Sequence, residues 1–400
     1  VQRILLSIMS SKKNIWMLDK WYAQSVAGNT GYVGERTLYA WGYNDAGQIG
    51  QNQSTPNPGS TKSSPIQIGS ATNWRQLSYI GSGREHMSCL RTDYEPGSGT
   101  LYGWGSNAQG QLGLSNTVSR SSPTQTYQGS EWKWNQATLG YGNQMGVLTN
   151  GKLYVWGYNT YGGLGLNQPT PTTKDDPDSG DNLGLGWAVG KNTIAASAYG
   201  QYAIKDDNTL WVWGGNANGE LGLNDTTRYS SPVQIPGTWS KVFGGSNSAG
   251  AINTSGELFT WGENPYGLLG HSNQTNYSSP KQLPGTAWAT AAFGPAAGTF
   301  LKTTGELYMC GRGTSGRLGQ NNQTDYSSPR QIPGTWIKAC NPRGGQGGIK
   351  ADGSLWTWGG NGEGKLGHND QTNYSSPKQI PGTWMDIVSN QPAMFGIKQS

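Results

Sequence analysis

Charged residues are scarce in this chain of 400 residues, at 13%, and they are spread along its whole length. The net charge of +5 is too dilute for a nucleic-acid-binding surface, which needs clustered Lys and Arg, so we expect no nucleic-acid partner. No apolar run reaches the roughly 18 residues of a membrane-spanning helix, and we expect no membrane insertion. The apolar stretch at residues 4–9 is too short for a signal peptide and lacks a small-residue cleavage site.

Cysteine and phenylalanine are also rare, with 3 and 5 copies. Three cysteines cannot all pair with one another, which favours a reducing compartment, and we expect Cys310 and Cys340 to be buried small residues. Strong helix formers are few while Gly is abundant, at 63 residues, which argues against a helical protein. The chain is nevertheless rich in Trp (18) and Tyr (20), which disordered chains lack. A polar all-β protein with many tight turns fits this composition.

Two phrases recur along the chain with a period of about fifty residues. The first is Ser-Ser-Pro-x-Gln-Ile-Pro-Gly-Thr-Trp, which ends at Trp239, Trp336 and Trp384 and, in a longer variant, at Trp288. The second is Leu-aromatic-x-Trp-Gly, and Cys310 takes the place of its tryptophan in one unit. The tryptophans of the other units are Trp41, Trp104, Trp156, Trp213, Trp261 and Trp358. This spacing predicts seven structural units.

Each unit is predicted to contain four short strands. Alternating aromatic residues predict a strand at 257–261, a Pro-bracketed extended segment follows, and further strands begin at Trp288 and near 297. Four strands in each unit are typical of a propeller blade. The last residues, 395–400, match the strand that elsewhere precedes Leu-Trp-x-Trp, and 37–41 supply the missing continuation. We therefore expect the two ends to pair in one shared blade, which closes the ring and removes open sheet edges.

On these residues the chain resembles the regulator-of-chromosome-condensation repeat family. The motifs that carry the resemblance are Leu-Trp-x-Trp-Gly, the Ser-Pro element and an Asn-x-x-Gly-x-Leu-Gly loop, as in residues 216–222. The resemblance covers residues 31–400 and implies an all-β, seven-bladed β-propeller of four-stranded blades. The long Ser-Ser-Pro phrase is similar to repeat proteins of marine bacteriophages, which implies a structural component of a virion.

Residues 1–30 lie outside the repeats, and we expect them to form an N-terminal anchor or docking segment. Their apolar side chains are too many for a free tail. The segment therefore either packs against the propeller or docks on a partner subunit. The candidate docking residues are Trp16, Met17, Leu18, Trp21 and Tyr22.

Histidines do not form a catalytic motif. His271 and His368 share one loop register in which other units hold Leu or Gln, and a position that accepts Leu is no metal or base site. His86 stands alone, with no nucleophile motif. The run at 359–365 mimics a phosphate loop, but Leu366 replaces the required Ser or Thr and no helix follows, so we expect a turn.

Asp175, Asp176 and Asp178 are weak candidates for a calcium site. Pro177 interrupts their loop and no bidentate Glu closes it, so an exposed acidic loop is the simpler interpretation. Without a nucleophile, a metal motif or a cofactor motif, we expect a protein that is not an enzyme and that holds no cofactor and no metal.

The tryptophans of the two phrases are expected to pack between blades, where each can bury a large apolar area. The loops that follow Trp-Gly vary more and are rich in Tyr, Asn and Gly, a composition typical of recognition surfaces. Simple drift of loop residues is the alternative. The candidate binding residues in these loops are Tyr43, Asn44, Tyr158, Tyr161 and Tyr266.

These observations predict a non-enzymatic virion protein, structural or for host attachment, which is assembled in the host cytoplasm. Its partners would be other virion proteins and a host receptor or glycan, within a larger assembly. One alternative is a regulator like a guanine-nucleotide exchange factor, for which only residues 167–186 offer a wedge-like acidic insertion. Another is a carbohydrate-binding, lectin-like propeller.

Overall fold

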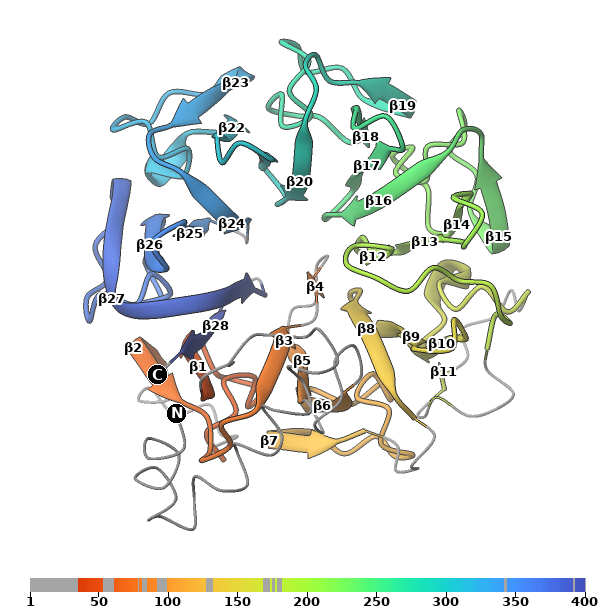
Figure 1. The fold of residues 1–400 in the computed structure, drawn as a ribbon, viewed down its shortest axis with the longest axis horizontal. Coiled ribbons are helices and arrows are strands. Elements are labelled where there is room, and N and C mark those ends of the chain that lie inside the picture. The colour runs from red at the N-terminus through yellow and green to blue at the C-terminus, as the bar shows by residue number, and fades with distance from the viewer. Residues whose placement is uncertain are drawn as a thin grey trace, which may run out of the picture.

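The chain folds into a ring of seven blades around a central axis (Figure 1), which confirms the predicted seven-bladed propeller. The segment 1–30 with its docking candidates, and the candidate calcium ligands Asp175, Asp176 and Asp178, lie outside the described residues. The computed structural model describes residues 35–52, 61–77, 79–80, 85–91, 99–126, 132–167, 173–174, 177, 182–341, 344–390 and 393–399.

Each blade is a sheet of four antiparallel strands, which follow one another from the inner strand at the axis to the outer strand at the rim. Blade 1 contains the end of β27 (Tyr374–Ser389), β28 (Ala393–Gln399), β1 (Arg36–Gly42) and β2 (Lys62–Gln67). Blade 2 contains β3 (Trp74–Leu77), β5 (His86–Arg91), β6 (Thr100–Gly105) and β7 (Arg120–Gln125). Blade 3 contains β8 (Trp134–Leu139), β9 (Asn143–Leu148), β10 (Leu153–Tyr158) and β11 (Thr173–Lys174), with the short β4 (Tyr79–Ile80) added in parallel to β8.

The remaining blades follow the same order around the ring. Blade 4 contains β12 (Ile194–Ala196), β13 (Gly200–Ile204), β14 (Leu210–Gly214) and β15 (Tyr229–Ile235). Blade 5 contains β16 (Trp239–Gly244), β17 (Ser248–Asn253), β18 (Leu258–Gly262) and β19 (Tyr277–Gln282). Blade 6 contains β20 (Trp288–Phe293), β21 (Ala297–Lys302), β22 (Leu307–Gly311) and β23 (Tyr326–Ile332). Blade 7 contains β24 (Trp336–Cys340), β25 (Gly345–Lys350), β26 (Ser354–Gly359) and the start of β27.

The ring closes in blade 1, as predicted. β1 pairs antiparallel with β28, so that Arg36 lies opposite Gln399 and Gly42 lies opposite Ala393. β27 is the longest strand, at 16 residues; its start pairs with β26 and its end pairs with β28, which joins blades 7 and 1 in one sheet. Both ends of the propeller therefore meet in one sheet (Figure 1), and no edge is left open there.

The tryptophan of each Trp-Gly phrase is fully buried and links two blades. Its indole Nε1 donates a hydrogen bond to a loop carbonyl of the preceding blade, and the Sγ of Cys310 does the same toward Leu268 at 3.4 Å. The pairs are Trp41–Lys365 (2.8 Å), Trp104–Gln48 (2.7 Å), Trp156–Gln111 (3.1 Å), Trp213–Gly163 (3.1 Å), Trp261–Glu220 (2.8 Å) and Trp358–Arg317 (3.0 Å). The predicted packing of these tryptophans between blades is thus confirmed.

The loop that follows Trp-Gly is shaped by a buried asparagine in six blades. The Oδ1 of this asparagine accepts a hydrogen bond from the backbone N–H five residues later, which satisfies a donor inside the turn. In blade 6 Gly313 takes the place of the asparagine, and its own N–H donates to Asp325 Oδ1 at 2.7 Å. The bonds are Ile49 to Asn44, Leu112 to Asn107, Leu164 to Asn159, Leu221 to Asn216, Leu269 to Asn264 and Leu366 to Asn361.

Helical structure in the described part of the chain is limited to two 3-10 turns, η1 (Thr160–Gly162) and η2 (Thr314–Gly316). Neither these turns nor any other described segment forms a helix with the length and apolarity needed to cross a membrane.

Candidate functional site

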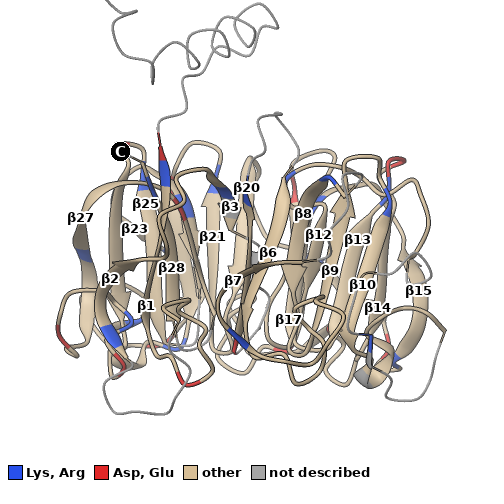
Figure 2. Ribbon diagram, turned by 90° about the horizontal axis from the view of Figure 1, so that it is seen from below, with Lys and Arg blue, Asp and Glu red and all other residues tan. Residues whose placement is uncertain are grey.

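The direction of the strands divides the propeller into two faces, seen side-on in Figure 2. The channel face carries the first residues of the inner strands, and Arg36 lies there at the start of β1. The tyrosine face carries the loops that follow the inner strands and those that follow Trp-Gly. Tyr43, which comes directly after the end of β1 at Gly42, lies on this second face.

Three tyrosines gather on the tyrosine face at the joint between blades 3 and 4. The ring of Tyr161 lies edge-on to that of Tyr199, with 5.1 Å between the ring centres, and Tyr199 lies 5.9 Å from Tyr141. The guanidinium carbon of Arg228 lies 5.5 Å from the centre of the Tyr161 ring. Tyr161 is 45% exposed and Tyr141 is 41% exposed. These four residues, each from a different loop, form what we call the tyrosine patch.

Tyr161 holds an unfavourable backbone conformation within this patch. Its φ of 59° lies in the left-handed region, where a side chain as bulky as tyrosine is rarely found. Tyr266, at the same loop position of blade 5, is not among the residues with positive φ. Such strain is typical of residues that are held in place for binding or catalysis.

The other predicted binding residues do not join the patch. Asn44 is fully buried and its side chain stabilises the loop, so the prediction that it contacts a partner is wrong. Tyr43 donates its hydroxyl to Asp45, and Tyr266 lies beneath Arg312, whose Nη1 donates to the tyrosine hydroxyl at 3.4 Å. Tyr158 is half-buried, and its backbone N–H donates to the carbonyl of Gly142, beside Tyr141.

Sequence reasoning missed Tyr141, Tyr199 and Arg228. It considered only the loops that follow Trp-Gly, whereas the loops between the first and second strands of a blade open onto the same face. The available signal was the dipeptide Tyr-Gly, which stands before the second strand in both blade 3 and blade 4, at Tyr141 and Tyr199.

The histidines and cysteines are buried or half-buried parts of the blades. The Nε2 atoms of His271 and His368 lie 2.8 and 2.9 Å from the hydroxyls of Thr260 and Thr357, and burial lowers the pKa of each imidazole to about 4. His86 is buried, which lowers its pKa to about 4 as well. All three cysteines are buried, and no disulfide joins any of them within the described part of the chain. Within the described ranges, no three His, Cys, Asp or Glu side chains come together as a metal site requires.

The phosphate-loop mimic at 359–365 is a turn, as predicted. It follows the last residue of β26, and its register matches the turns after Trp-Gly in the other blades. Asn361 is the buried asparagine of this turn. Its Oδ1 accepts a hydrogen bond from the backbone N–H of Leu366, as the equivalent asparagines do in the other loops.

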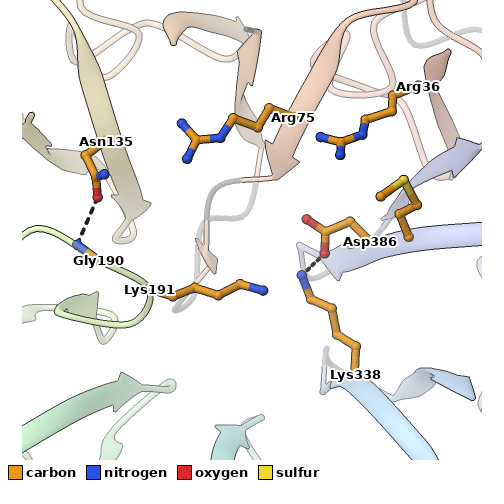
Figure 3. A pocket seen from close by; sticks show the side chains of 8 residues that line it. Arg36, Arg75, Asn135, Gly190, Lys191, Lys338 and Asp386 are labelled. Carbon is orange, nitrogen blue, oxygen red and sulfur yellow. Dashed lines mark hydrogen bonds and ion pairs between the residues drawn. The ribbon is translucent and has the colours of Figure 1, made fainter. Parts of the chain in front are cut away.

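A second cluster, of cationic side chains, lines a cavity on the channel face, between the inner strands of the ring (Figure 3). In six blades the inner strand begins with a buried tryptophan, and the pairing register shifts by one residue directly after it. Such a β-bulge re-aims the side chains beside it. Arg75, Lys338 and Asp386 occupy these bulged positions, one or two residues after their tryptophans, and they line a cavity of about 370 Å³.

Two further cations line the same cavity: Arg36 at the start of β1, and Lys191 in the segment before β12. We call Arg36, Arg75, Lys191, Lys338 and Asp386 the basic channel site. Burial lowers the pKa of both guanidinium groups, and the neighbouring charge of Arg75 lowers that of Arg36 further. Burial and the charge of Lys191 lower the pKa of Lys338 to about 7.

Comparisons with known proteins agree with the fold. A family model described as "Regulator of chromosome condensation (RCC1) repeat" matches residues 98–143, 207–252, 255–295, 304–339 and 352–388. Human WBSCR16 superposes with a TM-score of 0.74 at 19% identity, covering 91% of this chain and 99% of that one. Prp20p from Saccharomyces cerevisiae gives a TM-score of 0.75 at 16% identity, covering 92% of each chain. At these identities the likeness shows the fold alone.

The chain is also similar in sequence to parts of longer, curated proteins. The ultraviolet-B receptor UVR8 of Arabidopsis thaliana is 27% identical over 208 residues, which is 50% of this chain and 42% of the receptor. The X-linked retinitis pigmentosa GTPase regulator of Canis lupus familiaris is 31% identical over 160 residues, which is 39% of this chain and 15% of the regulator. The chain thus spans less than half the length of these relatives. Because the repeat model matches more than half of its residues, the chain belongs to the regulator of chromosome condensation (RCC1) repeat family.

Proposed function

We propose that this chain is a non-catalytic propeller that binds a protein partner through the tyrosine patch. The observation that carries the proposal is the convergence of three half-exposed tyrosine rings and Arg228 from four separate loops. Tyrosine and arginine are enriched among the residues that dominate protein–protein binding energy. The strained backbone of Tyr161 adds support, because such strain is typical of functional sites, and the contacts of its ring with Tyr199 and Arg228 hold the ring in place.

Two solved structures of one similar propeller, Prp20 of yeast, favour a protein as the partner. Prp20p is described with its binding properties to Gsp1p and histones, and yeast RCC1 (Prp20) is described bound to Kap60. These are partners of that propeller. They support the proposal for this chain because the two propellers share a fold over nearly their whole length.

The substitution Tyr161→Asn tests the proposal. Asparagine tolerates the left-handed backbone region better than tyrosine does, so we expect the free energy of unfolding not to fall. Removing the central ring of the patch should weaken partner binding by about 2 kcal/mol or more, the usual loss for a dominant interface residue. The measurement is quantitative cross-linking of the full chain in extract of its source cells, followed by titration of the captured protein.

Val118→Asn is the matched control. Val118 is 56% exposed in the loop after Trp-Gly of blade 2, on the same face but outside the patch. This variant should retain the partner that Tyr161→Asn loses. If both variants retain it equally, the tyrosine patch is not the binding surface.

A second candidate function is guanine-nucleotide exchange on a small GTPase, which the fold shared with Prp20p favours. The predicted wedge comprises residues 167–186. Most of its residues before position 182 lie outside the described part of the chain. The test is the release of labelled GDP from Gsp1p in the presence of the full chain. Acceleration would favour exchange activity, and an unchanged release rate would dismiss it for this GTPase.

A structural or attachment role in a virus particle is a narrower form of the same proposal, since it also needs contacts with other proteins. None of the relatives named is described as a virion protein. Co-sedimentation of the chain with particles would favour this role, and its recovery only as a free monomer would argue against it. A lectin-like role is tested by a glycan array, on which the absence of binding would argue against it.

A further inference from the structure

We propose that the basic channel site binds a phosphate group. Four cationic side chains from four parts of the ring line one cavity of about 370 Å³: Arg36 from blade 1, Arg75 from blade 2, Lys191 from the segment before blade 4, and Lys338 from blade 7. Figure 3 shows them around one open space, with a single carboxylate, that of Asp386, among them. The inference does not depend on the tyrosine patch, which lies on the opposite face.

The carboxylate of Asp386 is already fully engaged. It forms an ion pair with Lys338, and it also accepts backbone hydrogen bonds from the N–H of Leu77 at 3.1 Å and from its neighbour Ile387 at 2.9 Å. Asp386 therefore compensates one cation of the four. Arg36, Arg75 and Lys191 have no ion pair with an acidic side chain in the described part of the chain.

The two arginines have nitrogen atoms with unmet hydrogen-bonding capacity. Arg36 Nε and Arg75 Nη1 are buried and have no hydrogen-bond partner. A buried donor without an acceptor costs free energy, and a buried cation without a counter-charge costs more. Burial lowers the pKa of both guanidinium groups, and the charge of Arg75 lowers the pKa of Arg36 further. A bound anion would supply the acceptors and the counter-charge together.

The number and type of donors favour phosphate over carboxylate. A phosphate carries nearly two negative charges at neutral pH and at least three acceptor oxygens, which matches two planar guanidinium groups and a lysine. The cavity has room for more than the anion, and it continues into a second cavity of about 220 Å³ through the shared residues Lys191 and Lys338. The phosphate can therefore be free, or it can be carried on a small molecule or on a side chain of a partner.

Titration calorimetry of the full chain at low ionic strength tests the proposal, with inorganic phosphate as the probe and acetate as a singly charged comparison. We expect phosphate to bind at least tenfold more tightly than acetate, and added salt to weaken it. A phosphoserine peptide and its unphosphorylated form distinguish the sources. Tighter binding of the phosphopeptide than of inorganic phosphate points to a partner's side chain, and equal or weaker binding points to a free phosphate. If neither phosphate nor phosphopeptide binds better than acetate, the proposal is wrong.

Arg75→Gln and Arg330→Gln form the matched pair of variants. Both remove one positive charge, but Arg330 lies on the outer strand β23, where its guanidinium packs over Tyr326. Arg75→Gln should weaken phosphate binding about tenfold or more, the usual effect of one charge-assisted hydrogen bond, while Arg330→Gln should leave it unchanged. Without phosphate, Arg75→Gln should melt no lower than the original chain, because it removes an uncompensated buried charge. Equal affinities in the two variants would overturn the proposal.

Discussion

At the scale of single residues, one indole group in each of six blades forms a hydrogen bond with the preceding blade. Trp261 illustrates the arrangement, because its Nε1 donates to the carbonyl of Glu220 in the preceding blade at 2.8 Å and its ring is fully buried. The seventh joint uses Cys310, whose Sγ donates to the carbonyl of Leu268 and which belongs to the same apolar cluster as Leu268 and Phe300.

Trp261→Phe should lower the free energy of unfolding by about 1 kcal/mol, because it removes the hydrogen bond between the blades and leaves the carbonyl of Glu220 only the bond from the hydroxyl of Tyr202. Urea unfolding followed by circular dichroism measures the loss. Trp211→Phe is the control, since the indole of Trp211 bonds only the nearby hydroxyl of Thr209 in a partly exposed place. A loss at Trp211 as large as that at Trp261 would contradict the role of the link between blades.

Buried histidines make the propeller sensitive to acid, namely His86 and the pair His271 and His368. The hydroxyl of Thr260 donates to the carbonyl of Leu269, so it accepts from the Nε2–H of a neutral His271, and His368 repeats this arrangement with Thr357. The pKa of each imidazole is about 4 in the folded chain and about 6.5 when unfolded. Between these values the unfolded state binds more protons, so stability falls as the pH falls from about 6.5 toward 4.

The double variant His271→Gln with His368→Gln should lose less stability between pH 7 and pH 5 than the original chain. Glutamine suits this register, because Gln320 already occupies it in blade 6, where its Nε2 donates to the carbonyl of Gln331 at 3.1 Å. Urea midpoints at the two pH values provide the measurement. An unchanged difference between them would show that other groups cause the acid sensitivity.

At the scale of the elements, β28 closes the ring between β27 and β1. Ile397 on this strand is fully buried opposite Leu38, whereas Gln399 is only half-buried opposite Arg36. Ile397→Asp would place an unpaired carboxylate in the core of blade 1. Gln399→Asp makes a similar chemical change at the end of the same strand.

We expect Ile397→Asp to cost about 4 kcal/mol or more and to expose the edges of β1 and β27 to aggregation. Gln399→Asp should cost less than about 0.5 kcal/mol, as is usual for a surface change. Thermal unfolding and light scattering compare the two variants. Similar stability and mass for both would mean that pairing of β28 does not hold the ring closed.

The blades, their closure and the buried tryptophans could be predicted because their residues recur in every repeat. The same recurrence carried a signal that was overlooked: Asn44 has a counterpart in five other loops, which indicates a structural role and not a variable contact. The cations of the channel could not be predicted from net charge. Arg75 directly follows its blade tryptophan and is the only arginine in that column, Lys338 follows its tryptophan by two residues, and only the closed ring brings the two cations together.

At the scale of the whole molecule, every blade is complete within residues 36–399. A chain that lacks residues 1–30 should therefore fold with a melting temperature within a few degrees of the full chain's. Light scattering of both forms then tests the docking residues Trp16, Met17, Leu18, Trp21 and Tyr22. A full chain that assembles and a shortened chain that stays monomeric would support their proposed role as an anchor.

Loss of the folded propeller on this truncation would contradict the completeness of the ring. Equal masses for the two forms, with the fold retained, would contradict the anchor role and favour packing of the segment on its own propeller.

The pairing of Arg36 with Gln399 has a mechanical consequence. These two residues stand opposite each other at the same end of the ladder between β1 and β28. A pulling force applied to them would act across the ladder and break its hydrogen bonds one after another, as a zipper opens, instead of shearing all of them at once. The closure that protects the ring from thermal opening is thus the joint that would yield first under tension.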